Sequence, residues 1–423
     1  MTKLVGPILA LDLGQKLVGV AVSDERLVTT KRLPPLQRSN WKKLLQDLRQ
    51  LVESFDAQTI VVGLPLRLDG TTGDATNALH ADCTLTFGTI KRGHLVAREQ
   101  CGHIAVLDIG LGVHTERADG APLLVDERWV AEQIPPIDAS SHKGLRKKLV
   151  VIGGAEGMAG AAMLAARAAM RSGIGMVRLL VARESLGAVQ EAEPFALAGT
   201  WPEDDASVDT QIVQWADAVV IGPGLGRSPG ARALVERVLS RWRGPILLDA
   251  DALHAFAEID VLLIGERPVL LTPHPAEFAR LAGCDVADVL ARRYDIGAEL
   301  ARKLGVTVLL KGVPTVISGG TEILVSATGT PALAAAGSGD MLSGIAGTLL
   351  AQTGDALRSG AAAAWVHGRA AENASVGAST ATSGAVRGIT LDDVLLALGQ
   401  SWRLSRAPSR YPVLLELPRV GER

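Results

Sequence analysis

The sequence predicts an α/β protein whose larger part is a mostly parallel sheet with helices on both faces. Short, almost continuous apolar runs recur through the chain after about residue 148, and segments with helical spacing lie between most of them. Glycine-rich loops follow several of these runs. Alternating strands and helices are typical of parallel sheets, and strands that are buried on both faces are apolar throughout.

Composition limits the classes of protein that the chain can belong to. Its 423 residues are 48% hydrophobic and 21% charged, which predicts two or three domains with a sizeable core. The formal net charge of -2 provides no basic field for nucleic acid. Every apolar run long enough to cross a membrane contains a charge or a glycine cluster, so we expect no membrane contact. The three cysteines and eight histidines show no metal-ligand spacing, and so few cysteines indicate the cytoplasm.

The first 75 residues have the pattern of a small α/β segment. Strands are expected at Ile8–Leu13, Leu17–Ser23 and Thr59–Gly63, and Trp41–Phe55 has leucines on one helical face. This predicts an N-terminal unit at residues 1–75.

Two short regions follow. Residues 76–115 contain two strand-like runs, Cys83–Phe87 and Ile104–Ile109. Residues 116–140 are polar and contain Pro135-Pro136, which indicates a linker.

The principal domain is expected at residues 141–405, and residues 406–423 form a C-terminal tail. A helix from Gly160 to Arg171 follows the glycine pair Gly153-Gly154, and a second helix opens near Gly337 and continues through Leu349. The expected strands of this domain are Lys148–Ile152, Met176–Val181, Ala218–Ile221, Ile246–Leu248, Val269–Leu271 and Val306–Leu310.

The run Ala336–Asp340 has the strongest chemical pattern. Small residues at a helix start expose successive backbone N–H groups, which form a site for phosphate oxygens. Asp340 in the first turn could cap the helix, or it could be the base that takes a proton from a hydroxyl facing the phosphate. Because a cap alone does not require three small neighbours, we favour the catalytic interpretation.

Further candidate residues follow other predicted strands, where ligands of parallel sheets bind. Lys311 could reach a nucleotide phosphate or be an ordinary surface lysine. His274 lies between two prolines and could bind a ligand, begin a helix, or do both. Asp249 and Asp251 could hold Mg²⁺ through water or be loop residues, with no pattern to decide. The glycines of Gly222–Gly226 could allow a ligand close to the backbone or form a tight turn.

These motifs together resemble the ADP/ATP-dependent NAD(P)H-hydrate dehydratases, a branch of the ribokinase-like superfamily. The resemblance covers residues 142–403 and follows the family's order of motifs. The matching motifs are His142–Gly144, Gly153-Gly154, Gly157-Met158, Gly160–Ala162, Gly222–Leu225, Asp249–Leu253, Thr272–Pro275, Lys311-Gly312, Gly337–Asp340 and Trp365–Gly368.

The resemblance implies a lyase that dehydrates (S)-NAD(P)H-hydrate to NAD(P)H, with ADP or ATP as phosphoryl donor and Mg²⁺ as cofactor. It implies a homo-oligomer, which is a tetramer in that family. Asp340 is the implied catalytic residue. The implied substrate-binding residues are Ala161, Gly224, His274 and Asp340. The implied nucleotide-binding residues are Lys311, Gly312, Val313, Pro314, Thr315 and Gly339.

The front of the chain resembles two other families in part. Residues 8–73 resemble pre-16S rRNA nucleases related to Holliday junction resolvases, through Leu11–Lys16, Gly19–Asp24, Val61–Leu66 and Asp69-Gly70. Asp12 matches the first metal-binding carboxylate of that family, whose later acidic motifs are absent here. Residues 78–112 resemble the tail of the NAD(P)H-hydrate epimerase domain, without its substrate-binding front. We therefore predict neither activity.

Two alternatives to the dehydratase differ in their products and sites. A ribokinase-like kinase of a small vitamin-like alcohol would share the fold and Asp340, but it would accumulate a phosphorylated product. A metal-dependent nuclease acting through the N-terminal segment would need several convergent carboxylates and a basic surface.

Overall fold

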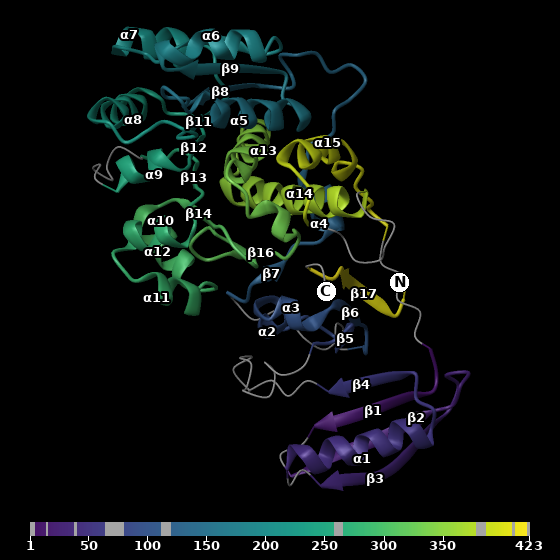
Figure 1. The fold of residues 1–423 in the computed structure, drawn as a ribbon. Helices are drawn as coiled ribbons and strands as arrows, with labels where there is room; N and C mark the ends of the chain where they lie inside the picture. Colours follow the sequence, from purple (N-terminus) through teal and green to yellow (C-terminus); the bar gives the residue numbers. More distant parts are fainter. Residues whose placement is uncertain are drawn as a thin grey trace. The chain divides into compact units, whose positions relative to one another are not determined.

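A computed structural model describes residues 5–13, 16–37, 40–63, 80–110, 120–257, 265–377, 386–407 and 411–420. The chain divides into two compact units, Met1–Leu107 and Asp108–Arg423 (Figure 1). The predicted motif residues Gly14, Gln15, Leu64–Leu66 and Asp69-Gly70 lie outside the described residues.

The second unit contains a ten-stranded sheet. The seven strands from β10 to β14 run parallel, β15 is antiparallel to both neighbours, and β7 is parallel to β16. This confirms the mostly parallel α/β prediction. The order is β10 (Leu197–Thr200), β9 (Met176–Val181), β8 (Lys148–Ile152), β11 (Ala218–Ile221), β12 (Ile246–Leu248), β13 (Val269–Leu271), β14 (Thr307–Leu310), β15 (Thr315–Ser318), β16 (Ile323–Ser326) and β7 (Leu123–Leu124).

Helices cover both faces of this sheet (Figure 1). Strand β8 shows why: Leu149 and Val151 belong to one buried core and Val150 and Ile152 to the other, because successive strand side chains point to opposite faces. The first face carries α5 (Ala159–Arg171), α6 (Arg183–Ala192), α13 (Ser338–Thr353), α14 (Ala356–Gly377) and α15 (Leu391–Ser401). The second carries α8 (Pro229–Arg241), α9 (Asp251–Phe256), α10 (Pro275–Ala282), α11 (Val286–Ala291) and α12 (Ile296–Leu304).

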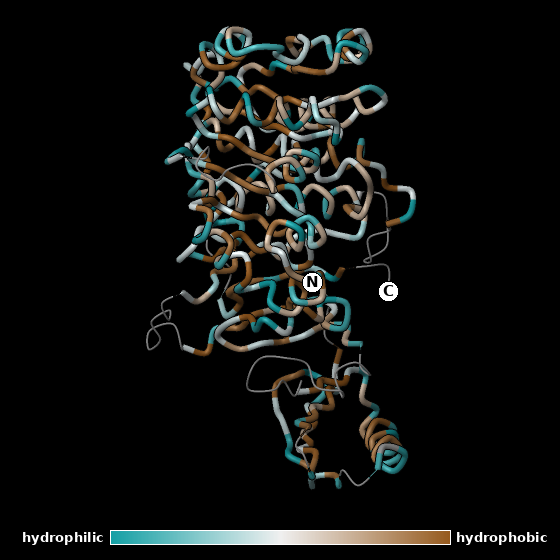
Figure 2. Tube along the Cα trace, turned by 90° about the vertical axis from the view of Figure 1, so that its left-hand side faces the viewer, coloured by the Kyte–Doolittle hydropathy of each residue, from teal (hydrophilic) through white to brown (hydrophobic). Residues whose placement is uncertain are grey.

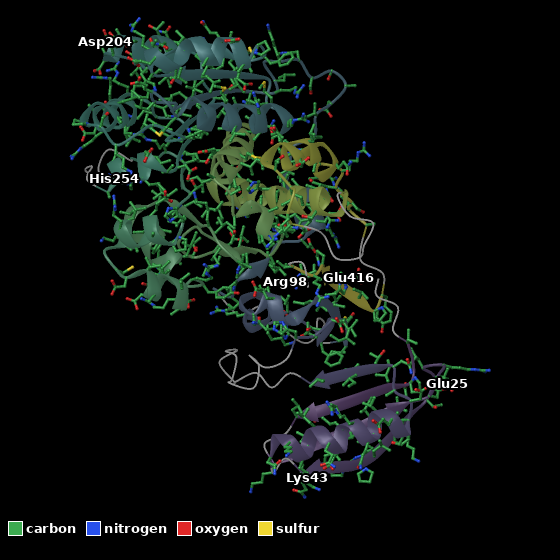
Figure 3. All side chains as sticks on the ribbon, in the orientation of Figure 1. Glu25, Lys43, Arg98, Asp204, His254 and Glu416 are labelled. Atoms are coloured by element: carbon green, nitrogen blue, oxygen red, sulfur yellow. The ribbon has the colours of Figure 1, made fainter. Side chains whose placement is uncertain are left out.

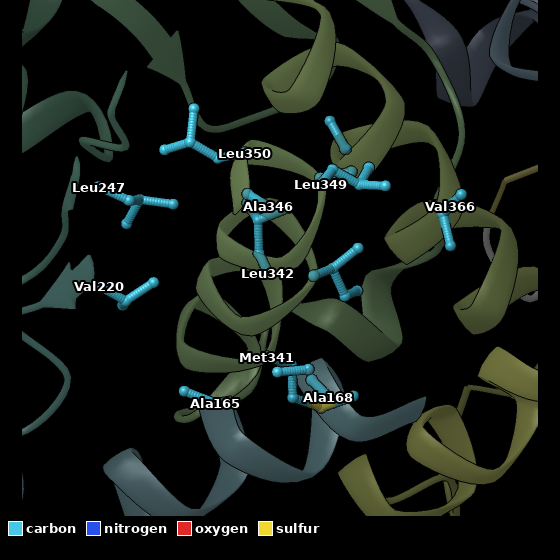
Figure 4. Close-up of a cluster of buried hydrophobic side chains, with 14 of the residues drawn as sticks. Ala165, Ala168, Val220, Leu247, Met341, Leu342, Ala346, Leu349, Leu350 and Val366 are labelled. Atoms are coloured by element: carbon cyan, nitrogen blue, oxygen red, sulfur yellow. The ribbon is translucent and has the colours of Figure 1, made fainter. Parts of the chain in front are cut away.

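Helix α13 packs unusually close to its neighbours. A Cβ atom at Gly344 would lie 2.0 Å from the carbonyl oxygen of Ala165, and one at Gly347 would lie 2.4 Å from Cγ2 of Val220. Figure 4 shows α13 side chains, including Met341 and Leu349, packed among residues of α5, α14, β11 and β12. Because glycine has no side chain, α13 packs tightly against α5 and β11, and this packing fixes the position of the helix and of its first turn.

The region that the sequence assigned to a linker contains a strand and a helix. Residues Leu123–Leu124 form β7, and α4 (Glu127–Gln133) follows, with Asp126 accepting a 2.7 Å hydrogen bond from the amide of Trp129. Val130 is fully buried in the core of the first face. The strand and the helix were not predicted because the segment is polar overall and only a few apolar residues attach it to the sheet.

Residues after β10 and after α15 complete the unit. Asp204, labelled in Figure 3, caps the short helix α7 (Asp205–Val208) in a capping box with Ser207. A π-helical turn (Asp209–Val213) follows α7, and a 3₁₀ turn (Pro331–Leu333) precedes α13. Strand β17 (Val413–Leu417) lies in the predicted tail.

The first unit contains a four-stranded sheet with the order β3-β2-β1-β4. Its elements are β1 (Ile8–Leu13), β2 (Leu17–Ser23), β3 (Thr30–Gln37), α1 (Trp41–Ser54) and β4 (Thr59–Gly63). Apolar residues of the strands and of α1 form its core, and Figure 2 shows hydrophobic residues along these elements. Strand β3 was not predicted because Thr30–Gln37 is polar and contains two prolines, which suits an edge strand.

A separate pair of parallel strands ends the first unit. Strands β5 (Cys83–Phe87) and β6 (His103–Leu107) pair in parallel, and α2 (Arg92–Val96) and α3 (Arg98–Cys101) lie between them in the sequence. Among the described residues of the whole chain, no helix has the length and apolar character needed to cross a membrane.

Candidate functional site

Backbone hydrogen bonds tie together the loops that follow the parallel strands. The amide of Gly222 donates to the carbonyl of Ile152 at 3.0 Å, and the amide of Asp249 donates to that of Ile221 at 3.1 Å. Farther along the sheet, Lys311 donates to the carbonyl of Pro273 at 2.9 Å. The loops after β8, β11, β12, β13 and β14 therefore meet at one edge of the sheet.

Lys311 is the centre of a charged cluster at this edge. Its Nζ lies 2.9 Å from Oδ1 of Asp249 and 3.9 Å from Oε2 of Glu277. Burial alone lowers the pKa of the Lys311 ammonium, but the charges of Asp249, Glu277 and Asp340 outweigh burial and raise that pKa. The ammonium is therefore fully charged at neutral pH and 21% of its side chain is exposed.

Asp340 lies in the first turn of α13, next to this cluster. The helix begins after Gly337, whose φ of 95° falls in the left-handed region that favours glycine. Burial and the like charge of Asp249 raise the pKa of Asp340 to about 7, although Lys311 lowers it. A carboxyl group that titrates near neutrality and stays partly exposed is suited to accept a proton.

Gly339 brings the helix start against the lysine. A Cβ atom at this position would lie 3.3 Å from Nζ of Lys311 and 3.9 Å from Oδ2 of Asp249. The backbone at Gly339 thus adjoins the ammonium. Helix N–H groups and a lysine at one place form a binding site suited to phosphate.

His274 begins α10, as one of the sequence interpretations proposed. Its Nδ1 accepts hydrogen bonds from the amides of Ala276 and Glu277, at 3.2 and 3.3 Å. Glu277 in turn accepts from the amide of His274 at 2.8 Å through Oε2. Since Nδ1 is an acceptor, Nε2 carries the hydrogen of the neutral ring, and the side chain is 51% exposed. The imidazole therefore caps the helix, and its Nε2 lies 3.4 Å from Oε1 of Glu277.

Ala161 on α5 and Gly224 in the loop after β11 lie against each other at the same edge of the sheet. A Cβ atom at Gly224 would lie 3.0 Å from the Cβ of Ala161, and Gly224 has a φ of 59°. The amide of Ala155 donates to the carbonyl of Gly224 at 2.7 Å. The loop after β11 is therefore fixed to the start of α5.

The segment from Gly312 to Thr315 turns sharply after Lys311. Gly312 has a φ of 147°, and its backbone passes so close to Arg293 that a Cβ atom would lie 2.6 Å from Nη2. The buried Arg293 donates to the carbonyl of Pro314 at 2.7 Å, and Thr315 donates to that of Gly312 at 2.9 Å. Val313 is 64% exposed at the tip.

The two aspartates after β12 have protein partners. Asp249 accepts from Ser343 at 2.7 Å as well as pairing with Lys311. Asp251 accepts from the amide of Gly226 and from Nε of Arg227, both at 2.9 Å. In the part of the chain that the structure describes, no group of three or more His, Cys, Asp and Glu residues could hold a metal ion.

Comparisons with known proteins decide the family. Residues 149–387 match the NAD(P)H-hydrate dehydratase family. The chain belongs to this family. The ADP-dependent (S)-NAD(P)H-hydrate dehydratase of Neisseria meningitidis serogroup B is 41% identical over 239 residues, which are 55% of this chain and 78% of that protein.

A solved structure and longer relatives extend this result. The ADP/ATP-dependent NAD(P)H-hydrate dehydratase of Bacillus subtilis, co-crystallised with ATP/Mg²⁺, is 29% identical with a TM-score of 0.57, and covers 67% of this chain and 98% of its own. The bifunctional NAD(P)H-hydrate repair enzyme of Moorella thermoacetica is 35% identical over 77% of this chain. The chain spans 64% of that relative's length. The predicted ribokinase-like dehydratase resemblance is confirmed.

The N-terminal part matches a second family. Residues 6–85 match the Holliday junction resolvase family, as the sequence indicated. Asp12 lies on β1, where its side chain is exposed and close to the backbone of Gly63. Among the described residues, it belongs to no cluster of metal-binding side chains.

Several residues in and around the candidate site were missed by sequence reasoning. Ser343 and Arg293 were not singled out, and Asp249 was considered only as a metal ligand or a loop residue. His367, in a motif shared with the family, is buried, and its Nε2 has no hydrogen-bond partner. Burial and nearby Lys311 lower the pKa of His367 to about 4, so the ring is neutral at physiological pH.

Proposed function

We propose that residues 141–405 dehydrate (S)-NAD(P)H-hydrate to NAD(P)H, with ADP or ATP as the phosphoryl donor. The observation that carries the proposal is the position of Asp340, a carboxyl group with a pKa of about 7 in the first turn of α13 and beside the Lys311 ammonium. Family membership supports the choice of substrates, since relatives with this domain carry the corresponding names.

The proposed reaction replaces a poor leaving group with a good one. Asp340 accepts the proton of the substrate hydroxyl, whose oxygen then forms a bond to the terminal phosphorus of ADP while the bond to AMP breaks. The lone pair of the ring nitrogen next expels phosphate, and loss of a proton from the neighbouring carbon restores the double bond. The products from ADP are NAD(P)H, AMP and phosphate.

The remaining site residues have proposed binding roles. Lys311 and the backbone at Gly339 stabilise phosphoryl oxygens, and the turn Gly312–Thr315 contacts the rest of the adenine nucleotide. Ala161, Gly224 and His274 contact the hydrated nicotinamide nucleotide, with Nε2 of His274 as a donor. Mg²⁺ is proposed to bind chiefly to the nucleotide phosphates, as this ion commonly does in phosphoryl-transfer sites.

The cellular setting and assembly follow from the same proposal. Both substrates are intracellular nucleotides, and Cys101 and Cys284 are free thiols. We therefore place the enzyme in the cytoplasm. A homo-oligomer is proposed from the family resemblance. The first unit is proposed to have neither nuclease nor epimerase activity.

The test uses the purified full chain with (S)-NADH-hydrate, Mg²⁺ and either ADP or ATP. The expected result is the return of reduced-nicotinamide absorbance with stoichiometric release of AMP from ADP. The Asp340→Asn variant is the control and should be inactive. A phosphorylated substrate that accumulates without forming NADH would identify a kinase and overturn the proposal.

A further inference from the structure

Asp249 is almost completely buried, yet both of its carboxylate oxygens have partners. Its side chain is 1% exposed. Oδ1 pairs with Nζ of Lys311 at 2.9 Å, and Oδ2 accepts from Oγ of Ser343 at 2.7 Å. Its backbone amide donates to the carbonyl of Ile221. A charge this deep is stable only when it is paired and hydrogen-bonded, so Asp249 is a fixed point of the site.

Lys311 needs such a fixed point. A lysine side chain is a flexible stem with a point charge, and holding it in one place costs rotamer entropy. Asp249 lies behind the ammonium, and the backbone of Gly339 lies beside it. The pair therefore presents the ammonium at the helix start instead of leaving it free to move in solvent.

The same carboxylate acts on Asp340 through space. After burial, Asp249 is the strongest influence that raises the pKa of Asp340. Asp251 acts in the same direction but more weakly, and its own oxygens are bonded to Gly226 and Arg227. The other groups around Lys311 are Glu277, which raises the pKa of the lysine, and His367, which is neutral.

We propose that Asp249 is a positioning residue that holds the Lys311 ammonium at the phosphate-binding helix start, beside the turn that carries Asp340. Ser343 orients Asp249 for this task. Asp249 itself contacts neither substrate nor nucleotide. The inference rests on the proposed function only in taking the nucleotide phosphates as the group that Lys311 binds.

The first experiment measures ADP binding to the full chain by titration calorimetry. Asp249→Asn should raise the dissociation constant for ADP by roughly tenfold, as expected when a charge-assisted contact is lost. Lys311→Met should weaken it at least as much, and the double variant should bind like Lys311→Met alone, because Asp249 acts through the lysine. Glu203→Gln, on the surface beside Arg183, is the matched control and should bind like the wild type.

Ser343→Ala provides a second variant in case Asp249→Asn does not fold. It removes only one hydrogen bond to Asp249 and leaves both charges in place. Binding of ADP should weaken by about threefold. Wild-type affinity in both Asp249→Asn and Ser343→Ala would overturn the proposal, as would additive losses in the double variant.

The second experiment needs no ligand. Carbon NMR of carboxyl-labelled protein follows the titration of Asp340, whose signal is identified by its loss in Asp340→Asn. In Asp249→Asn this titration should move to lower pH, because a like charge is removed and Lys311 is freed to pair with Asp340. An unchanged titration would overturn the role of Asp249. Absence of turnover in the wild type would refute the proposed function, and the two experiments would still decide the role of Asp249.

Discussion

Gly224 lies so close to Ala161 that a Cβ atom on the glycine would be 3.0 Å from the Cβ of the alanine. The same Cβ atom would be 2.7 Å from the carbonyl oxygen of Met158, a backbone atom that cannot easily move. The two small residues therefore allow the loop after β11 to contact the start of α5. This contact lies at the edge where Asp340 and Lys311 also gather.

Gly224→Ala is expected to damage both stability and activity. The left-handed backbone at φ 59° alone costs about 1–2 kcal/mol when a side chain is added, and the clash with Met158 adds to it. Urea unfolding and turnover should both show the loss. Gly187→Ala is the control, because this helical glycine has open space around it and alanine favours the helix. A fully stable and active Gly224→Ala would contradict the proposed place of this loop in the site.

His274→Asn separates the two roles of the histidine. Asparagine is a good helix N-cap, so the variant should keep nearly all of the stability, whereas His274→Ala should lose about 1 kcal/mol. Both variants lack the imidazole Nε2 donor, so both should show a raised KM for the hydrated nucleotide. Thermal unfolding and steady-state kinetics together make this distinction. If the KM of His274→Asn for the hydrated nucleotide equalled that of the wild type, helix capping alone would explain the role of His274.

The strands of the parallel sheet were predicted well because their pattern is local. Lys148–Ile152, Met176–Val181 and Val269–Leu271 are apolar runs bounded by turns or polar residues, and each forms a strand with those bounds. Strands β10 and β7 lie at the ends of the sheet and were missed because β10 includes Gly199 and Thr200 and β7 has only two residues. Strands β15 and β16 were missed because such short runs resemble loops when they are separated only by a glycine turn.

The site was predicted as separate motifs but not as a network. Lys311, His274 and Asp340 each follow a strand or open a helix, which a sequence pattern can reveal. Their connection runs through Asp249, which is 62 residues from Lys311 and 94 residues from Ser343 in the chain. No local pattern encodes a contact over such separations, because it depends on the order of strands in the sheet.

Turnover should depend on pH through Asp340. The proposed base must be ionised, and its pKa is about 7. The value of kcat/KM should therefore fall as the pH drops through about 7, and should level off above it, because kcat/KM reports groups of the free enzyme. Asp340→Asn should lower turnover by at least about 10²-fold at every pH while the circular dichroism spectrum stays unchanged. A flat profile of kcat/KM down to pH about 5 would remove Asp340 as the base.

Asp340→Asn should also make the protein more stable at neutral pH. The pKa of Asp340 rises from 3.8 to about 7 on folding, so between these values the folded chain binds a proton that the unfolded chain does not. Wild-type stability therefore loses this contribution as the pH rises from about 4 to about 7, and the ionised carboxylate remains unfavourable above it. The variant has no such group, so its free energy of unfolding should exceed that of the wild type by about 1–3 kcal/mol at pH about 8 and by less at pH about 5.

Urea unfolding at the two pH values measures the difference, and Glu203→Gln should follow the wild type at both. If the stability advantage of the variant over the wild type did not grow between pH about 5 and about 8, Asp340 would not be held in an unfavourable charged state, and its proposed readiness to accept a proton would lose its physical basis.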